Sequence, residues 1–356
     1  MSGPDQTENR KREHINICST RDVRSRYNFW DDIHLVHNAA PEIDAEEIDT
    51  KTGFLGKKFS APIVIAAMTG GFDIGEKVNA SLAEAAAEMQ VGMGVGSQRG
   101  ALDNSAKAKT YAVVKDFDVP MMIANIGAPQ IVRAGGFRQA SDMLTKAMDM
   151  IDADLVAIHL NYLQEAVQPE GEKSAKGLLA LIRDLSTDIP IIVKETGAGM
   201  SPALLKSLSK TKVKAADVGG AGGTSFSAVE FYRAQESGDD LKSRLGMTFW
   251  DWGIPAPVSA AIASLQLPTI ATGGIRDGLD VARAIAIDAS CAGIANKLLV
   301  PALEGAKAVS EELEAVIEEL KVAMFLTGSK DVRELAAQVP LVVGPTKEWL
   351  DHIAGA

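Results

Sequence analysis

The sequence predicts an α/β fold, a single (β/α)8 TIM barrel. Two observations predict it. Short runs rich in Val, Ile, Ala and Met recur eight times along the chain, and amphipathic, Ala-rich segments separate them. None of these runs alternates cleanly between apolar and polar residues, which is typical of parallel strands buried on both faces. Strand–helix alternation repeated eight times favours a closed barrel over an open sheet.

The expected strands each end in Gly or polar residues. They lie near residues 62–68, 91–96, 120–125, 154–160, 190–194, 213–218, 268–273 and 291–295. The expected helices lie at 76–89, 138–151, 173–186, 202–210, 226–236, 257–266 and 277–288, and a longer charged helix follows at 302–322. Ser201 and Pro202 suit the N-cap and the first position of the fourth helix.

Three regions fall outside the repeat: an N-terminal extension (1–60), an insertion before strand seven (237–256) and a C-terminal tail (331–356). The insertion holds two of the four tryptophans. It is either a cover packed on the barrel, or a lid or subunit contact. The tail is expected to form a helix and a packing strap. No linker-like stretch divides the chain, so residues 1–356 are predicted to form one domain.

Composition excludes several classes of function. A net charge of −11 argues against nucleic-acid binding, although a local basic pocket can still bind an anion. Cys18 and Cys291 have no metal-type spacing, so neither a disulfide framework nor a zinc site is indicated. No apolar run suits a secretory signal or a membrane span. We therefore expect a soluble, cytoplasmic protein with no membrane or nucleic-acid partner.

Residues with catalytic or binding potential follow nearly every expected strand, which is where barrel active sites form. After the first five strands they are Met68-Thr69-Gly70-Gly71, Ser97-Gln98-Arg99, Asn125, the group His159, Asn161, Gln164 and Glu165, and Lys194-Glu195. A scaffold without function has no need of such residues at these positions. Their concentration predicts an enzyme.

Two glycine-rich segments, 219–225 (GGAGGTS) and 273–276 (GGIR), follow strands six and seven, and Ala295-Asn296 follows strand eight. Glycines let backbone N–H groups approach a phosphate, and the next helix N-terminus adds a favourable dipole. The alternative is that these glycines only make tight turns. The two segments side by side favour a phosphate site of the barrel type.

Lys194 ends an apolar strand, where a lysine requires an anion such as a flavin ring edge or a phosphate. Pairing with Glu195 or another strand-end carboxylate is the less favoured alternative, because successive strand residues point in opposite directions. Glu165, with neighbouring amides, could hold Mg²⁺ partly through water. Composition alone favours a solvated carboxylate at that position.

His159 has three open interpretations: a diphosphate ligand, an acid/base group or a core histidine. Arg10 and Lys11, just before His14, are candidates for anion binding. On the residues alone, a disordered charged terminus is the favoured alternative.

With these residues in place, the sequence resembles a known family. The segments that carry the resemblance are NRKREHI (9–15), AAMTGG (66–71), GSQR (96–99), ANIGAPQ (124–130), HLNYLQEAVQPEGE (159–172), VKETGAGMS (193–201), DVGGAGGTSF (217–226), WGIP (252–255) and GGIRDGLDVARAIAIDAS (273–290). In these segments, which span most of the chain, it resembles the type 2 isopentenyl-diphosphate delta-isomerases, FMN-dependent barrels. HLNYLQEAVQPEGE is highly specific, whereas the glycine segments also occur in other FMN barrels.

The resemblance implies that the chain interconverts isopentenyl diphosphate and dimethylallyl diphosphate without net oxidation. It also implies reduced FMN as the working cofactor, NADPH or another donor to reduce it, Mg²⁺ for the diphosphate, and a homotetramer or homooctamer. The residues implied to contact FMN are Met68, Thr69, Gly70, Ser97, Asn125, Lys194, Gly219, Thr224, Gly274, Ile275, Arg276, Ala295 and Asn296.

The resemblance places a second set of residues on the substrate: Arg10, Lys11, Ser97, Gln98, Arg99, His159, Asn161 and Gln164. Glu165 would ligate Mg²⁺, and Glu230 is a weaker candidate behind that site. Gln164, His159 and Asn161 are the catalytic candidates beside reduced FMN. No side-chain pair fits both proton transfers, so the family interpretation assigns much of that chemistry to the flavin, with Gln164 orienting a proton relay.

The sequence departs from the family pattern at three positions. Gly219 stands where the family usually has Ser, Phe226 where Trp is common, and Asn296 where an apolar residue is common. All three concern the geometry around the cofactor and leave the substrate motif intact.

The nearest alternative is another FMN barrel, such as a 2-hydroxy-acid oxidase or dehydrogenase. That chemistry requires a histidine base on the strand-seven side, and no His lies between residues 160 and 351. A dehydrogenase with a cysteine nucleophile is disfavoured because Cys291 lies inside an expected strand. A non-catalytic flavin-binding or assembly protein would explain HLNYLQE only as a packed turn.

Overall fold

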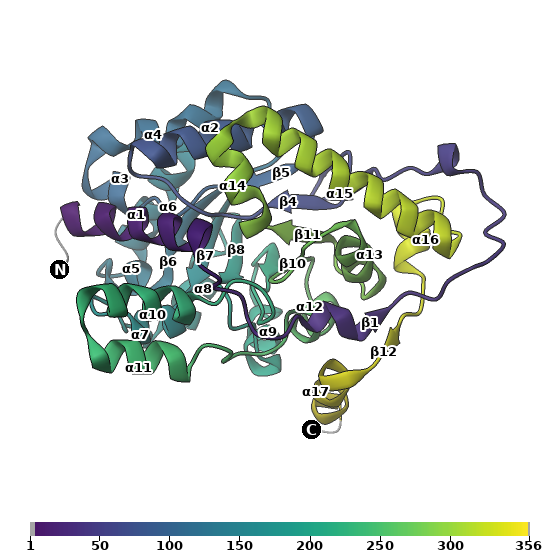
Figure 1. Ribbon diagram of the computed structural model, residues 1–356. Coiled ribbons are helices and arrows are strands. Elements are labelled where there is room, and N and C mark those ends of the chain that lie inside the picture. Colours follow the sequence, from purple (N-terminus) through teal and green to yellow (C-terminus); the bar gives the residue numbers. More distant parts are fainter. Residues whose placement is uncertain (1–3, 355–356) are drawn as a thin grey trace.

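The computed structural model describes residues 4–354. Eight parallel strands close into a barrel in the order β10-β11-β4-β5-β6-β7-β8-β9 (Figure 1). Their bounds are β4 (Ile63–Ile65), β5 (Gly92–Gly94), β6 (Met122–Gly127), β7 (Leu155–Leu160), β8 (Ile191–Glu195), β9 (Ala215–Asp217), β10 (Thr269–Thr272) and β11 (Cys291–Ile294). Each lies within or across an expected strand, so the predicted barrel is confirmed.

Helices surround the barrel. The outer helices are α2 (Asp73–Met89), α6 (Phe137–Ile151), α8 (Leu178–Leu185), α9 (Pro202–Leu208), α10 (Phe226–Ser237), α12 (Ala256–Ser264) and α13 (Gly278–Ala286). Ser201 caps α9 by accepting the Leu204 N–H, and Pro202 opens the helix, as predicted. Shorter helices that were not predicted occupy the loops: α3 (Arg99–Asp103), α4 (Lys109–Ala112), α5 (Ala128–Arg133) and α7 (Tyr162–Val167).

The single helix expected at 302–322 is wrong. Two helices stand there, α14 (Asn296–Glu304) and α15 (Ala306–Thr327). Gly305 separates them at φ 150° and ψ 176°, a positive-φ conformation that favours glycine and ends the helix. Because α14 begins directly after β11, its N-terminus lies at the open end of the barrel.

A hairpin closes the other end. Strands β2 (Thr52–Phe54) and β3 (Lys57–Phe59) pair antiparallel, and Phe54 and Phe59 pack into the cluster of side chains inside the barrel. A Cβ on Gly92, the first residue of β5, would lie 2.9 Å from the Phe59 ring. This contact places the hairpin at the N-terminal ends of the strands and leaves the C-terminal ends open.

The N-terminal extension begins with helix α1 (Pro4–Thr20), which crosses the open end of the barrel (Figure 1). Ile15 packs with Phe72 and Leu299, and Ile17 packs against α10. The disordered terminus favoured by the residues alone is therefore wrong. Burial of this apolar face against distant helices holds α1 in place, because most helix stability in proteins comes from tertiary packing.

The other peripheral segments pack around the barrel. The insertion forms α11 (Asp240–Thr248), which packs on α10, and the tail forms α16 (Val332–Ala336), β12 (Leu341–Val342) and α17 (Gly344–Ala354). β12 pairs with β1 (Ile33–His34). The 3₁₀ turns are η1 (Phe29–Asp32), η2 (Ala45–Glu47), η3 (Ser105–Lys107) and η4 (Val113–Asp116). Within residues 4–354, no helix is long and apolar enough to cross a membrane.

Candidate active site

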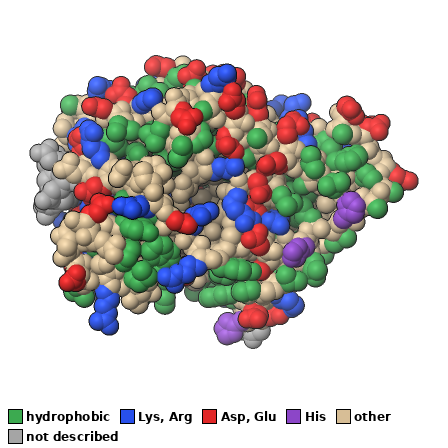
Figure 2. Space-filling view, viewed as in Figure 1, with side chains coloured by type: hydrophobic (Ala, Val, Ile, Leu, Met, Phe, Trp, Pro, Cys, Tyr) green, Lys and Arg blue, Asp and Glu red, His purple; other side chains and the backbone are tan. Residues whose placement is uncertain are grey.

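A cavity of about 1250 Å³ opens at the C-terminal ends of the barrel strands. Lys and Arg side chains surround the hollow on this face of the molecule (Figure 2). The predicted site residues that line it are Arg10, Lys11, Met68, Thr69, Ser97, Arg99, Asn125, His159, Asn161, Gln164, Glu165, Lys194, Gly219, Thr224, Gly274, Ile275, Arg276, Ala295 and Asn296. The structure thus brings both predicted sets into one chamber.

Two predicted residues do not line the cavity. The Gln98 side chain is fully buried: its Nε2 donates to the Ala147 carbonyl at 2.8 Å and its Oε1 accepts the Asn125 N–H at 2.9 Å. It therefore braces β6 and does not face the cavity. Gly70 lies against the Tyr111 ring, where a Cβ would come within 2.1 Å of a ring carbon.

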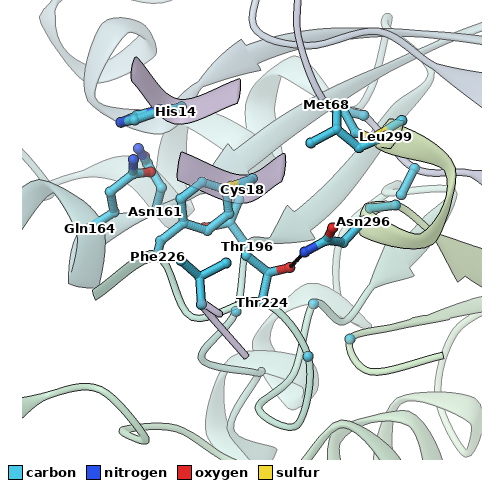
Figure 3. Close-up of a pocket in the computed structure, with 18 of the residues that line it drawn as sticks. His14, Cys18, Met68, Asn161, Gln164, Thr196, Thr224, Phe226, Asn296 and Leu299 are labelled. Atoms are coloured by element: carbon cyan, nitrogen blue, oxygen red, sulfur yellow. Dashed lines mark hydrogen bonds between the residues drawn. The ribbon is translucent and has the colours of Figure 1, made fainter. Parts of the chain in front are cut away.

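The glycine loops after β9 and β10 pack directly on each other. A Cβ on Gly273 (φ +113°) would lie 2.2 Å from the Gly220 carbonyl oxygen, so only glycine permits this approach. The Gly274 and Ile275 N–H groups have no hydrogen-bond partner among the described residues. Backbone N–H groups exposed in this way fit a phosphate, and Thr224 and Asn296 bond to each other beside them (Figure 3).

Arg276 contributes its backbone to this loop. Its guanidinium is held by Asp280 at 2.8 Å and Asp31 at 2.6 Å, so its charge is already neutralised. The cradle for a phosphate is therefore built mainly from backbone groups.

Lys194 bonds to Asp217 on the neighbouring strand at 2.9 Å, and both side chains are buried. The less favoured alternative, a strand-end carboxylate, is thus what the structure shows, because Lys194 and Asp217 are paired in register across β8 and β9. Glu195 points away and accepts three backbone N–H groups from residues 197–199. Lys194 still lines the cavity, so an anion there would share it with Asp217.

His159 is held by Asn125. Asn125 donates its Nδ2 to the Val95 carbonyl, which leaves its Oδ1 to accept from His159 Nδ1 at 2.7 Å. Burial, and then the positive charges of Lys194, Lys11 and Arg10, lower the pKa of His159 to about 3. The imidazole is therefore neutral in the free protein, protonated on Nδ1, with Nε2 free to accept.

Glu165 is buried at the cavity wall and accepts three donors: Asn161 Nδ2 at 2.8 Å, Gln168 Nε2 at 2.5 Å and the Glu172 N–H at 2.6 Å. The amide oxygens of Asn161 and Gln168 are buried and accept no hydrogen bond from any residue between 4 and 354. One carboxylate with two unsatisfied amide oxygens suits the oxygen ligands that Mg²⁺ prefers. Among residues 4–354 no cluster of three or more acidic, His or Cys side chains forms a metal site, so water and substrate oxygens would complete the coordination.

Lys11 lies on the inner face of α1. Its ammonium donates to the carbonyls of Gly70 (2.6 Å) and Ser97 (2.9 Å) and to the Tyr111 hydroxyl (2.6 Å). Burial, followed by the charges of Arg10 and Lys107, lowers the pKa of Lys11 to about 7. Tyr111 was not predicted, because nothing local in the sequence marks a buried tyrosine as a partner of the N-terminal arm.

A second group joins α1 to the opposite wall. Glu230 is buried on α10 and bonds to His14 at 2.9 Å, Gln164 at 3.0 Å and Arg233 at 2.6 Å. His14 and Gln164 point toward each other at one side of the cavity (Figure 3). His14, Gln164 and Arg233 lower the pKa of Glu230 to about 2 even though burial opposes this. His14 could have been found from its spacing of three and four residues from Lys11 and Arg10, which puts all three on one helix face.

Comparison with known proteins identifies the family. The model of the FMN-dependent dehydrogenase family matches residues 18–114 and 255–340. Isopentenyl-diphosphate delta-isomerase of Thermoplasma volcanium is 46% identical over 97% of this chain and 99% of its own length. The enzyme of that name from Archaeoglobus fulgidus is 45% identical over 97% of this chain and 99% of its own length. The chain belongs to the FMN-dependent isopentenyl-diphosphate delta-isomerase family.

Solved structures of other barrels share the fold at low sequence identity. A flavocytochrome b2 variant with bound sulfite superposes with a TM-score of 0.64 at 15% identity, over 92% of this chain and 78% of that one. A lactate oxidase of Pediococcus acidilactici gives a TM-score of 0.59 at 16% identity, over 88% and 84%. The chain therefore shares its barrel fold with these two structures.

Proposed function

We propose that this chain converts isopentenyl diphosphate into dimethylallyl diphosphate in the presence of reduced FMN, Mg²⁺ and NADPH or another electron donor. One observation carries the proposal. A cradle of glycine loops suited to the FMN phosphate faces a wall that holds Glu165, two unsatisfied amide oxygens and several cations. Such a wall can bind a diphosphate together with a metal.

The side chains divide the work of binding. Glu165, with the amide oxygens of Asn161 and Gln168, would hold Mg²⁺, and Arg10, Lys11 and Arg99 would meet the diphosphate oxygens. The glycine loops and Asn296 would hold the FMN phosphate, and Lys194, shared with Asp217, would lie at the ring. When bound, the reduced flavin supplies an electron-rich ring at which an allylic proton can be gained or lost.

The chain's own residues then set the protonation around the hydrocarbon tail. Neutral His159 presents Nε2 as an acceptor, and Gln164 is oriented by its bond to Glu230. Helix α1, Phe226 and Met68 enclose the chamber. Apolar side chains beside the substrate would keep water away from cationic or radical character on it.

The alternative function is oxidation of a 2-hydroxy acid, the activity of structural neighbours with this fold. It requires a histidine base on the loop after β10, and that loop reads Gly273-Gly274-Ile275-Arg276. The histidines that line the cavity among the described residues are His14 and His159, which lie on α1 and β7. The site therefore favours the isomerase.

Assembly and location stay predictions. We propose a homotetramer or homooctamer in the cytoplasm, and Trp252 on the insertion, 64% exposed, is a candidate for a subunit contact. Light scattering after size-exclusion chromatography measures the assembly.

The test of function is direct. The protein is loaded with FMN, reduced with dithionite or NADPH, and incubated with Mg²⁺ and isopentenyl diphosphate. Appearance of dimethylallyl diphosphate is expected, with none when the flavin is kept oxidised. Bound, reduced flavin without product contradicts the isomerase assignment, and turnover of lactate or mandelate with flavin reduction supports the alternative.

A further inference from the structure

Glu172 lies in the loop after α7, outside the cavity. Its Oε1 accepts from Arg99 at 2.9 Å and from Arg133 at 2.8 Å, and its Oε2 accepts from Gln130 Nε2 at 2.8 Å. Arg99 and Gln130 line the cavity, whereas Glu172 does not. Arg99 comes from the loop after β5 and Gln130 from the loop after β6. The Glu172 carboxylate therefore holds both cavity side chains from outside the cavity.

The backbone of the same residue is fixed to the proposed metal site. The Glu172 N–H donates to Glu165 Oε2 at 2.6 Å. The preceding Gly171 passes so close that a Cβ there would lie 1.8 Å from the Glu165 carbonyl oxygen. Glu165 and Glu172 are thus joined by a hydrogen bond and by close packing of the backbone between them.

Arg99 has one good carboxylate partner. The Glu172 side chain is 12% exposed, and the second acidic neighbour of Arg99, Asp103, lies 3.7 Å away and is 65% exposed. Burial works to raise the pKa of Glu172, but Arg99, Gln130 and Arg133 hold it below its usual value, so the carboxylate remains ionised. A partly buried, charge-assisted pair orients a guanidinium more strongly than an exposed pair does.

We propose that Glu172 is a positioning residue for diphosphate binding: it sets the direction of Arg99 and fixes its distance from Glu165. The inference rests on the proposed function, in which the diphosphate meets both the metal at Glu165 and the guanidinium of Arg99. A single residue bonds to both groups, through its backbone and through its side chain. The spacing of the two diphosphate-binding groups is thereby built into one loop.

The first experiment compares Glu172→Gln with the unchanged holoenzyme. Loss of the charge releases Arg99, so KM for isopentenyl diphosphate and Kd for magnesium pyrophosphate, measured by calorimetry on the oxidised protein, should each rise about tenfold. kcat and the flavin spectrum should stay within about twofold. Asp103→Asn is the matched control: it removes the exposed partner of Arg99 and should change neither constant by more than about twofold.

A double-mutant cycle shows whether Glu172 acts through Arg99. In an Arg99→Ala background, Glu172→Gln should add less than about a twofold change in pyrophosphate Kd, because the group it positions is gone. Effects that multiply across the two sites would overturn the proposal, as would an unchanged or lower Kd in the single variant. If Glu172→Gln loses its fold or its flavin, Glu172→Asp decides, with an expected weakening of about threefold.

The pyrophosphate measurement separates this inference from the proposed function. A protein that binds magnesium pyrophosphate and loses that binding in Glu172→Gln, yet does not isomerise, keeps the positioning role and rejects the isomerase. A protein that isomerises while Glu172→Gln behaves like the unchanged chain rejects the positioning role alone.

Discussion

One wall of the cavity is formed mainly by backbone groups and the opposite wall by side chains. The wall after β9 and β10 is mostly backbone: glycine loops in contact, with the free N–H groups of Gly274 and Ile275 between them. The opposite wall is made of side chains from α1, α7 and α10, joined by ion pairs and hydrogen bonds. A backbone wall binds any suitable phosphate, whereas a side-chain wall selects a particular substrate.

This difference explains how one barrel serves two kinds of chemistry. The structural neighbours among flavin oxidoreductases share the fold at about 15% identity. In this chain Glu165 and His14 line the side-chain wall, and Glu230 bonds to His14 and Gln164 from behind it. Under the proposed function, the shared fold would set where the flavin lies and the side-chain wall would select the substrate.

Substitution of a glycine in the backbone wall should have the largest effect on stability. In Gly273→Ala, the new Cβ would meet the Gly220 carbonyl at 2.2 Å on a residue with φ +113°. Overpacking and backbone strain together cost about 2–5 kcal/mol. We expect a strong fall in the thermal midpoint and loss of bound flavin, measured by differential scanning fluorimetry and absorbance.

Gly53→Ala is the control for this change. Gly53 has an ordinary φ, and its nearest neighbour would be 3.7 Å from the added Cβ. The thermal midpoint of this variant should stay near that of the unchanged chain. A Gly273→Ala protein that keeps its flavin and its midpoint would show that the two loops do not pack as described.

A substitution on the side-chain wall should lower the activity of the enzyme while leaving its fold intact. Glu165→Gln removes the charge that would hold Mg²⁺, so Mg²⁺-dependent kcat/KM should fall about 100-fold. The flavin spectrum should be unchanged, because Glu165 lies away from the glycine loops. Glu84→Gln, on an exposed position of α2, is the matched control; loss of flavin in Glu165→Gln instead would mean that this loop belongs to the cofactor.

The backbone wall could be predicted from the sequence. Eight apolar runs and two glycine segments are local signals, and each can be read without knowing what lies opposite. The N-cap at Ser201 was predicted for the same reason. The failures at the site involve partners that are distant in sequence: Lys194 pairs with Asp217 through strand register, and the Gln98 side chain donates to the Ala147 carbonyl.

The N-terminal arm shows this limit most clearly. Residues 10–14 look like a charged, disordered terminus. The bond between His14 and Glu230, 216 residues apart in sequence, and the buried site of Lys11 add to the apolar packing that holds α1 in place. The family resemblance named Arg10 and Lys11, but it could not supply their partners. Long-range side-chain networks have no local pattern, so the substrate wall had to be seen in the structure.

The buried ammonium of Lys11 predicts a pH dependence on this wall. Its pKa is lowered to about 7, so the lysine is charged below that pH and loses its proton as the pH rises through it. kcat/KM, which reports ionisations of the free enzyme, should therefore fall above about pH 7. Lys11→Met should lower kcat/KM at pH 6 about 30-fold and abolish this descending limb; a limb that persists assigns the ionisation to another group.

The smallest expected effect concerns Tyr111, which couples the two walls. Its ring packs against Gly70 on the flavin side, and its hydroxyl accepts from Lys11 and donates to the Ser97 carbonyl at 2.5 Å. Tyr111→Phe keeps the ring and removes one acceptor from the Lys11 ammonium. KM should rise about threefold, as for loss of one hydrogen bond.

The same variant should shift the pH profile. One acceptor fewer disfavours the ammonium, so the descending limb of kcat/KM should move to lower pH while the flavin spectrum stays the same. Tyr162→Phe removes a comparable hydroxyl bond, to the Ser174 carbonyl at 2.9 Å, away from Lys11, and should leave the limb in place. If both variants raise KM without moving the descending limb, Tyr111 only supports packing. A limb that moves in Tyr111→Phe alone shows that the Tyr111 hydroxyl helps to keep the Lys11 ammonium charged.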